Sequence, residues 1–259
     1  QLFVLHDTTE AREIELMKSN FISVASHQIR TPLTGIRWAV DMLRSKDTGE
    51  LNDEQSTILN NVSEVMQHFA ELIDDQLDVS RIDEGRFSYE FVEADIYQIA
   101  ERTIHNLTPA AEARNITITL TEPEEQLPTV CVDRDKMDIA IQNLIDNAIK
   151  YSPQDEGDIR VTFSYTDTTL TLSVKDNGIG IPEDQHAFVF NKFFRAPNAV
   201  RVVQNGSGLG LYITKQIVEM HNGTIAFTSA ENAGSTFTIT WPLTPSQWPR
   251  EASDTTTKD

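Results

Sequence analysis

A histidine lies in an amphipathic stretch near the start of the chain, within the sequence SHQIRTPL (residues 26–33). Apolar side chains around it recur at spacings of three, four and seven, which predicts a helix over residues 10–44. At about 100° per residue, His27 lies away from the apolar stripe of this helix. An accessible and mostly neutral imidazole is a nucleophile that can accept a phosphoryl group. The alternative is an exposed histidine near a tolerated kink.

Pro32 interrupts the same helix five residues after His27. Proline removes a backbone donor and bends a helix, so we expect a loosened segment that lets a second domain reach the imidazole. Gln28 can orient the imidazole through a hydrogen bond but cannot take its proton. Together with Arg30 and Thr31, these residues form the candidate catalytic group.

Two asparagines and a lysine share one face of a predicted helix in the segment NLIDNAIKYS (residues 143–152). Asn143 and Asn147 are four residues apart, and Lys150 lies one turn further. Amide oxygens suit a hard cation such as Mg²⁺, and an ammonium group binds phosphate. The alternative is a polar face that contacts only solvent.

Two glycine-rich segments have the spacing of ligand-binding loops. DNGIGIP (residues 176–182) follows a predicted strand, and GSGLGL (residues 206–211) opens a predicted helix. In the first, Asp176 can accept a hydrogen bond from a purine amino group while the glycines permit close backbone approach. In the second, free amides at a helix N-terminus suit phosphate. The alternatives are an ordinary Asp-Gly turn and a flexible hinge.

Aromatic and basic side chains alternate in FNKFFR (residues 190–195). Lys192 and Arg195 can meet negative charge, while the phenylalanines anchor the segment. The alternative is a set of core phenylalanines beside two solvated bases.

The elements that must position these groups fall into two parts, of which the first is a predicted helical hairpin. The polar turn SKDTGELN (residues 45–52) joins the first helix to a second, which has Asp53 as a candidate N-cap and apolar positions spaced through Val79. One hairpin cannot cover both wide apolar faces, so we expect two copies to pair into a four-helix bundle. The alternative is a hairpin that packs on its own downstream domain.

The second part is predicted to be an α/β sandwich. Stretches rich in Thr, Val and Ile predict strands over residues 116–120, 130–132, 159–165, 170–175, 224–228 and 236–241. Helical patterns separate them over residues 96–112, 135–151 and 210–221. We therefore expect a hairpin domain over residues 10–85, a sandwich over 86–243 and a disordered tail over 244–259.

Taken in chain order, four segments of the second part resemble the nucleotide-binding boxes of the sensor histidine kinases. NLIDNAIKYS resembles the asparagine box, DNGIGIP the first glycine box, FNKFFR the phenylalanine box and GSGLGL the second glycine box. SHQIRTPL resembles their phosphoacceptor box, and GSTFTI (residues 234–239) resembles their final strand. The same nucleotide-binding boxes occur in chaperone, gyrase and mismatch-repair ATPases, but those proteins lack the histidine hairpin. The resemblance implies a multidomain α and α+β protein, with a dimeric four-helix bundle followed by an ATP-binding sandwich of the Bergerat (GHKL) type.

Carried onto this sequence, the resemblance implies that His27 attacks the γ-phosphate of ATP. Asn143 and Asn147 would hold Mg²⁺, and Asp176 would bind the adenine amino group. The other nucleotide-binding residues that the resemblance implies are Lys150 on phosphate, Tyr151 near the base, Gly178 and Gly180 in the adenine-binding loop, Lys192 or Arg195 on the transferring group, Gly206, Gly208, Leu209 and Gly210 around the triphosphate, and Thr236 on the final strand.

Gln28 departs from the family pattern, because an acidic residue that can take a proton usually follows the histidine. We expect kinase activity all the same, followed by transfer to an aspartate of a response-regulator receiver domain. Thr31 stands where the family's phosphatase motif has Thr or Asn, but Gln28 replaces the acidic partner of that motif, so phosphatase activity stays open.

Two other functions compete with the kinase. A clamp-type ATPase would need a catalytic glutamate four residues before Asn147, where this chain has Asn143. A non-catalytic signalling scaffold would bind nucleotide without phosphorylating His27. The intact boxes favour the kinase over both.

Composition excludes several further roles. The 259 residues have a formal net charge of −19 at pH 7 and no Lys/Arg-rich run, so we expect no binding to nucleic acid or anionic membrane. No apolar stretch reaches the roughly 18 residues that span a bilayer. The single cysteine, Cys131, excludes an intrachain disulfide. These features fit a cytoplasmic location for this part of the protein.

The chain begins at Gln1 without an initiator methionine, so we expect a fragment of a longer protein, whose attachment to a membrane stays open. LHDTTE (residues 5–10) resembles the end of a PAS sensor domain, and residues 1–9 are assigned to that upstream sensor or its linker. The signal, the response regulator and the choice between phosphorylation within or between subunits also stay open.

Overall fold

The computed structural model describes residues 28–45, 49–123 and 126–244. The chain divides into two compact units, Gln1–Phe87 and Ser88–Asp259. His27 and the predicted upstream segment and tail beyond residue 244 lie outside the described residues. Within the described part, no helix is both long and apolar enough to cross a membrane.

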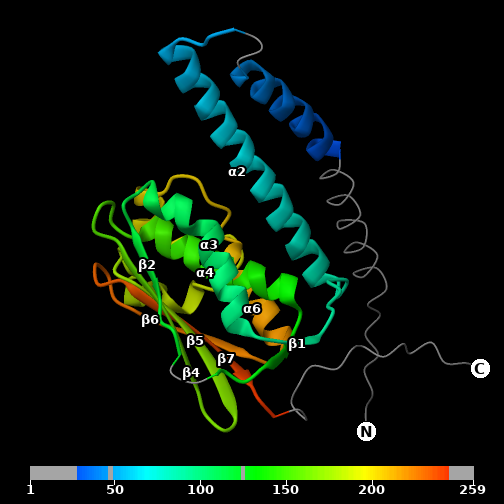
Figure 1. Cartoon of the computed structure of the whole chain (residues 1–259), viewed down its shortest axis with the longest axis vertical. Coiled ribbons are helices and arrows are strands. Elements are labelled where there is room, and N and C mark those ends of the chain that lie inside the picture. The colour runs from blue at the N-terminus through cyan, green and yellow to red at the C-terminus, as the bar shows by residue number, and fades with distance from the viewer. Residues whose placement is uncertain (1–27, 46–48, 124–125, 245–259) are drawn as a thin grey trace, which may run out of the picture. The chain divides into compact units, whose positions relative to one another are not determined.

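The first unit is an antiparallel pair of helices, residues 28–44 and α2 (Asp53–Asp83) (Figure 1). Side chains join the two helices at both ends. Arg30 pairs with Asp74 at 2.5 Å, and Arg44 Nη1 donates to Ser63 Oγ at 3.5 Å. Because the lower-numbered arginine meets the higher-numbered partner, the helices run in opposite directions. The predicted hairpin is therefore present.

The start of α2 differs from the prediction by one residue. Asn52, and not Asp53, is the N-cap: its side chain accepts the N–H of Gln55 at 2.8 Å, and the Gln55 side chain accepts the N–H of Asn52 at 3.0 Å. This reciprocal pair satisfies two backbone donors that the first turn leaves free. Asp53 is the first helical residue, where a carboxylate favours the positive end of the helix dipole.

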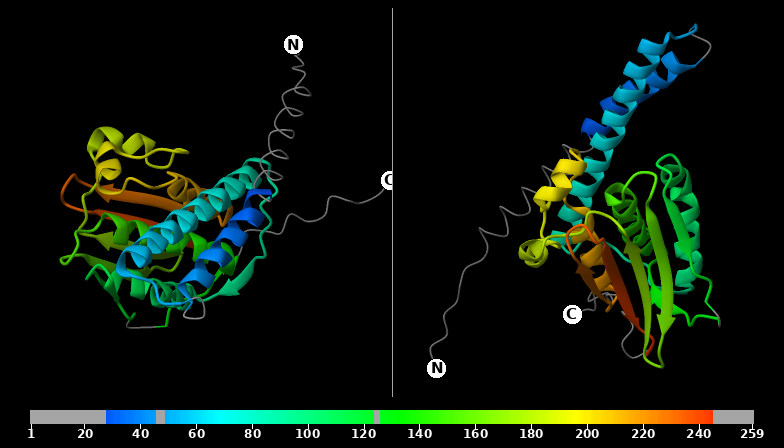
Figure 2. Two further views of the ribbon diagram at one scale, coloured as in Figure 1. Left: turned by 90° about the horizontal axis from the view of Figure 1, so that it is seen from above. Right: turned by 90° about the vertical axis from the view of Figure 1, so that its left-hand side faces the viewer.

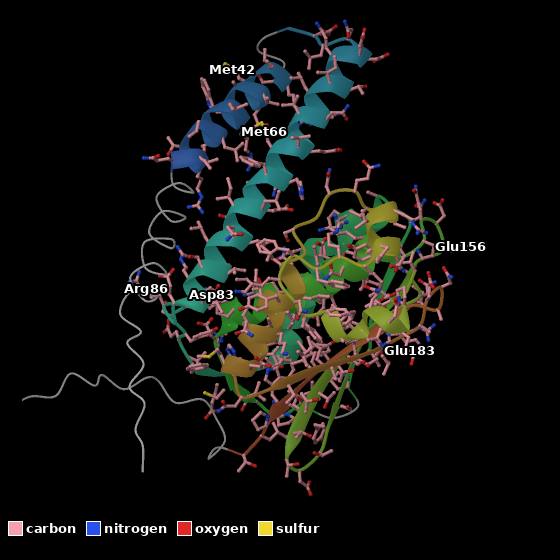
Figure 3. The ribbon with its side chains drawn as sticks, turned by 180° about the vertical axis from the view of Figure 1, so that it is seen from behind. Met42, Met66, Asp83, Arg86, Glu156 and Glu183 are labelled. Carbon is pink, nitrogen blue, oxygen red and sulfur yellow. The ribbon has the colours of Figure 1, made fainter. Side chains whose placement is uncertain are left out.

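Apolar side chains in the hairpin divide into an inner and an outer group. Val40 and Met66 are buried and line the groove between the two helices, as Figure 3 shows for Met66. In the single chain the outer group is exposed, with Trp38 at 65% and Val65 at 64%. The exposed set is Ile29, Ile36, Trp38, Met42, Leu43, Ile58, Val62, Val65 and Phe69. The hairpin alone therefore leaves a large apolar surface in contact with water.

The second unit is built on a five-stranded sheet in the order β2-β4-β5-β7-β6. Only β2 and β4 pair in parallel; the other neighbours are antiparallel. A separate two-stranded sheet pairs β1 with β3. The strands are β1 (Val92–Ala94), β2 (Thr117–Leu120), β3 (Val130–Val132), β4 (Asp158–Tyr165), β5 (Thr169–Asp176), β6 (Thr224–Ser229) and β7 (Ser235–Pro242).

Three helices pack against one face of this sheet: α3 (Ile96–Glu112), α4 (Arg134–Tyr151) and α6 (Gly210–Met220) (Figures 1 and 2). The core lies between the two layers, where every second residue of the central strands is fully buried, as at Leu172 and Ile239. The alternate positions of the same strands are mostly Thr, Ser and Lys and face away from the helices. Sandwich and hairpin together confirm the predicted fold class.

Short elements account for what the sequence patterns missed. The structure adds β1, a 3₁₀ helix η2 (Glu183–Phe188) and the six-residue helix α5 (Pro197–Val202). None is long enough to show a hydrophobic period. Helices η2 and α5 lie in the sequence between the two glycine-rich segments, DNGIGIP and GSGLGL.

Candidate nucleotide-binding site

Asp176 ends β5 as a buried carboxylate. Its Oδ1 atom accepts the backbone N–H of Gly178 at 2.8 Å and that of Ser235 at 3.1 Å. Burial raises the pKa of this carboxyl group above its ordinary value, and the two hydrogen bonds oppose that rise. Because both bonds go to Oδ1, Oδ2 is the oxygen that can accept a hydrogen bond from a bound ligand.

The loop after Asp176 requires glycine at two positions. A Cβ atom on Gly178 would lie 2.5 Å from the carbonyl oxygen of Tyr151, which also accepts the N–H of Ile179 at 3.1 Å. Gly180 has φ +61°, and its Cβ would lie 1.9 Å from the carbonyl oxygen of Ala230. These contacts hold the loop against the end of α4 on one side and against the β6–β7 turn on the other.

Ser235, and not Thr236, is the residue that the final strand brings to Asp176. Successive side chains of a strand point to opposite faces of the sheet. Ser235 is buried on the face that includes Asp176, whereas Thr236 pairs with Lys175 on the other face. The expected role of Thr236 in nucleotide binding therefore has no geometric support, and Ser235 is the residue that sequence reasoning missed.

Asn143 joins α4 to the start of α6. Its Nδ2 atom donates to the carbonyl oxygen of Gly210 at 3.3 Å and to Thr214 Oγ1 at 3.4 Å. The donor side of the amide is therefore engaged, and the oxygen Oδ1 can accept a cation. Asn147 lies one turn further along α4 and is half-buried. Lys150 pairs with Asp146 on the same helix at 2.5 Å, and both side chains are partly exposed.

Amide oxygens fit the cation that the site would need. Among residues 28–45, 49–123 and 126–244, no three His, Cys, Asp or Glu side chains gather as metal ligands. A hard cation such as Mg²⁺ takes oxygen ligands and usually keeps several waters or substrate phosphates. Two amide oxygens one turn apart on α4 match that limited requirement.

The GSGLGL loop enters α6 with no side-chain cap at its first turn, because Leu209 occupies the N-cap position. Gly208 has φ +66°, and its Cβ would lie 2.8 Å from backbone atoms of Phe193 and Phe194. The N–H groups at the start of α6 thus have no side-chain acceptor from the cap residue, which is the arrangement that binds phosphate oxygens. Gly210 begins the helix beside Asn143.

The basic side chains of FNKFFR have partners within the second unit. Lys192 Nζ lies 4.8 Å from the centre of the Tyr212 ring. Arg195 donates to the carbonyl oxygens of Gln204, at 2.9 Å, and Val203. Its guanidinium group also lies against Gly206, where an added Cβ would be 3.2 Å from Cζ. Arg195 therefore holds the backbone that precedes the GSGLGL loop.

The phenylalanines of this region are only partly core residues. Phe190 packs edge-on against Phe227, with ring centres 5.7 Å apart. Phe188 and Phe193 are 47% and 62% exposed. The segment thus anchors one aromatic ring and presents others to solvent.

The candidate catalytic group lies in the first unit. Gln28, Arg30, Thr31 and Pro32 are exposed at the start of the described helix, and Arg30 pairs with Asp74. Pro32 has no N–H to donate to the carbonyl of Gln28, so the helix lacks one hydrogen bond next to residue 27. The bend was predicted near His27 and Pro32; residues 28–44 form one continuous helix through Pro32, and the part of the prediction that concerns His27 lies outside the described residues.

The four motifs of the second unit therefore form one connected group. The first glycine loop touches the end of α4 through Tyr151, α4 touches α6 through Asn143, and the GSGLGL loop touches Phe193. A buried carboxylate, a helix face with amide oxygens and an uncapped helix N-terminus are combined. This combination, in an α/β sandwich, is suited to binding a purine nucleotide.

Comparison with known proteins identifies the family. Residues 17–85 match the family model HisKA, described as the His Kinase A (phospho-acceptor) domain. Residues 132–245 match HATPase_c, described as the Histidine kinase-, DNA gyrase B-, and HSP90-like ATPase. The chain therefore belongs to the sensor histidine kinases and contains both their phosphoacceptor and ATP-binding domains.

Relatives of known name agree with this assignment. The alginate biosynthesis sensor protein KinB of Pseudomonas aeruginosa is 31% identical over 242 residues, which cover 93% of this chain and 40% of KinB. Sensor protein kinase WalK of Staphylococcus saprophyticus is 36% identical over 248 residues, which cover 92% of this chain and 39% of WalK. The chain thus spans about two fifths of the length of these relatives.

Solved structures also match this chain. Full-length ShkA in complex with AMPPNP matches 86% of this chain and 45% of its own, with a TM-score of 0.68 and 25% identity. The catalytic domain of the histidine kinase ThkA matches 61% of this chain and 99% of its own, with a TM-score of 0.52 and 28% identity.

Proposed function

We propose that this chain is the catalytic core of a histidine kinase, which moves the γ-phosphoryl group of ATP to His27 and then to an aspartate of a response-regulator receiver domain. The observation that supports this most directly is the Asp176 carboxylate. It is buried beside two glycine-dependent turns, in a chain that also has a phosphoacceptor domain.

Each part of the nucleotide has residues suited to it. Asp176 accepts the adenine amino group through Oδ2, with Ser235 and Gly178 fixing the orientation of the carboxylate. The uncapped N-terminus of α6 and the GSGLGL loop bind phosphate oxygens. Lys150 can exchange Asp146 for phosphate, because both groups are partly exposed.

Asn143 and Asn147 would hold Mg²⁺ through their amide oxygens. The ion, when bound, would neutralise phosphate charge during transfer. This chain's part is to aim Asn143 Oδ1, which the two hydrogen bonds from Nδ2 to Gly210 and Thr214 orient.

The transfer step needs position more than covalent chemistry. A nitrogen of His27 forms a bond to the γ-phosphorus, and the bond to the β–γ bridging oxygen breaks, releasing ADP. The imidazole then loses its N–H proton. Gln28 cannot accept that proton, so we propose that it orients the ring and that the proton passes to water. Phosphatase activity, which lacks its acidic residue at the same position, is weaker or absent.

Three partners follow for the whole protein. A second copy covers the exposed apolar face of the hairpin, a receiver domain accepts the phosphoryl group, and an upstream sensor acts on the first helix. Because ATP is available in the cytoplasm, we place both domains there.

Radiolabelled ATP with Mg²⁺ tests the kinase directly, with His27→Ala as the control. We expect label on the chain that is lost in acid and kept in alkali, the stability of a phosphoramidate, and no label on His27→Ala. Measurable ATP binding without label on the wild-type chain would contradict the kinase and favour the nucleotide-binding scaffold.

A further inference from the structure

The loop that follows Asp176 is bound through its backbone by segments far away in the sequence. The carbonyl oxygen of Ile179 accepts the N–H of Asn232, in the β6–β7 turn, at 2.7 Å. The carbonyl oxygen of Gly180 accepts Nδ2 of Asn198, on α5, at 2.9 Å. The second bond joins two segments that both border the nucleotide site, and it is made by a side chain outside the motifs identified from the sequence.

Both functions of the Asn198 amide are used. While Nδ2 donates to Gly180, Oδ1 accepts the backbone N–H of Ala199 at 3.0 Å. The N-cap of α5 is Ala196, which offers no side-chain acceptor. The Asn198 side chain therefore bridges the first turn of α5 and the loop.

The Gly180 end of this bridge is fixed. Gly180 adopts φ +61° at a place where a Cβ would overlap the carbonyl oxygen of Ala230. The next residue, Ile181, donates its N–H to Ser229 Oγ at 2.8 Å. With the loop fixed on both sides, the direction of the Gly180 carbonyl is set, so the hydrogen bond restrains α5 and not the loop.

The part of the chain that contains α5 is also restrained beyond the end of that helix, by a different residue. We call residues 196–207, between FNKFFR and the second glycine of GSGLGL, the lid segment. Arg195 binds the carbonyl oxygens of Val203 and Gln204 near its end. Asn198 therefore supplies the restraint at the start of the lid segment, and Arg195 the one after α5.

We propose that Asn198 is a positioning residue that fastens the start of the lid segment to the loop after Asp176 and so sets the lid segment for the phosphate groups of a nucleoside triphosphate. This inference rests on the proposed ATP site. The inference divides that site into an adenine-binding part and a phosphate-binding part. The hydrogen bonds that hold Asp176, from Gly178 and Ser235, do not involve Asn198.

The separation predicts which ligands respond. Loss of the Asn198 donor leaves the adenine-binding carboxylate in place but frees the start of the lid segment. Affinity for a triphosphate should fall, while affinity for adenosine, which has no phosphate, should not. If Asn198 served only the stability of the fold, its loss would lower the affinity for both ligands together.

The experiment compares Asn198→Leu and Asn198→Asp with the wild-type chain by calorimetric titration with a non-hydrolysable ATP analogue plus Mg²⁺, and with adenosine. Leu removes both hydrogen bonds at similar size. Asp keeps the acceptor for Ala199 but faces the Gly180 carbonyl with an oxygen, and so remains informative if the Leu chain does not fold. Asn106→Leu, at an exposed position of α3, is the control for the loss of an amide elsewhere in the unit.

We expect affinity for the analogue to fall about five-fold in both Asn198 variants, the effect of one ordinary hydrogen bond, with adenosine affinity unchanged. An equal fall for both ligands, or no fall for the analogue, would overturn the positioning role. If the wild-type chain binds neither ligand, the ATP site itself is wrong, and that result is distinct from either of the others.

Discussion

The Nε2 atom of His221 accepts the backbone N–H of Asp133 at 2.9 Å, although the two residues are 88 positions apart. Nδ1 of the same ring lies 2.6 Å from the carbonyl oxygen of Ile217 and must donate to it. Asp133 in turn accepts the N–H of Asp135, at the start of α4, and that of Glu90 at 2.8 Å. The ends of α4 and α6 that lie away from the nucleotide motifs are thereby joined.

This arrangement requires a neutral imidazole, because a protonated Nε2 cannot accept a hydrogen bond. Burial lowers the pKa of His221, and the Ile217 carbonyl and Asp133 oppose the shift. Below about pH 6.5 the unfolded chain therefore binds a proton that the folded chain does not, and stability falls as the pH drops toward the lowered pKa.

We expect the free energy of unfolding to decrease between about pH 7.5 and pH 5.5, measured by urea denaturation. His221→Gln can keep an acceptor for Asp133 but does not titrate, so its decrease should be smaller. An equal decrease in both chains would show that other groups cause the pH dependence.

Asp176→Asn separates the fold of the site from its binding function. The Asn Oδ1 can still accept the N–H groups of Gly178 and Ser235, while Nδ2 replaces the oxygen that faces the ligand. A donor would then meet the donor of the adenine amino group. We expect adenosine affinity to fall at least about ten-fold, the cost of losing a hydrogen bond to a charged group.

The free energy of unfolding of Asp176→Asn should be higher than that of the wild-type chain, or equal to it. Burial raises the pKa of Asp176, so above that pKa the charged carboxylate costs folding free energy, and the neutral amide removes the cost.

In the wild-type chain adenosine affinity should decline as the pH falls through the raised pKa of Asp176, whereas the Asn variant should show no such decline. Titrations at several pH values would decide this, and a pH-independent wild-type affinity would contradict the carboxylate's role.

The regular elements could be predicted because their patterns are long. All eight residues of β5 alternate between buried and less buried positions, β4 does so over its first four residues, and the 18 residues of α4 repeat an apolar face. Glycines at 180 and 208 were also informative, because both adopt a positive φ beside a neighbouring backbone. Such positions show in the sequence as glycine whatever surrounds them.

Other features depend on partners that the local sequence does not reveal. Ser235 and Thr236 are both hydroxyl residues on one strand, and only the register against β5 shows which one faces Asp176. Asn198 and Arg195 bind backbone carbonyls whose positions follow from the tertiary fold. The Asn52 cap was missed by one residue because Asp at position 53 is an equally good cap by type.

The two outer glycines of GSG differ in how much they tolerate a side chain. In Gly208→Ala the new Cβ would lie 2.8 Å from backbone atoms of Phe193 and Phe194, and φ +66° disfavours any L-residue. In Gly206→Ala the nearest atoms would be those of the Arg195 guanidinium, at 3.2 Å, and the end of a side chain shifts more easily than backbone. Binding of the ATP analogue should therefore be lost, or reduced about ten-fold or more, in Gly208→Ala and reduced less in Gly206→Ala. Equal effects would mean that backbone strain does not control this loop.

The exposed apolar face of the hairpin predicts a dimer. Val65 is 64% exposed in the single chain and shares one side of α2 with Val62, Phe69 and Ile58, which lie three, four and seven residues from it. A charge placed there would have to be buried without a partner when two copies pair. We expect Val65→Glu to weaken the dimer at least about ten-fold.

Light scattering across a range of protein concentrations measures this equilibrium. Asn60→Glu adds the same charge at an exposed position about 140° around α2 from Val65, and should leave the dimer intact. A wild-type chain that stays monomeric at every concentration would contradict the dimer and would mean that another part of the protein covers the apolar face of the hairpin. Equal weakening by both variants would point to net charge, because repulsion between two chains of charge −19 acts wherever the charge is placed.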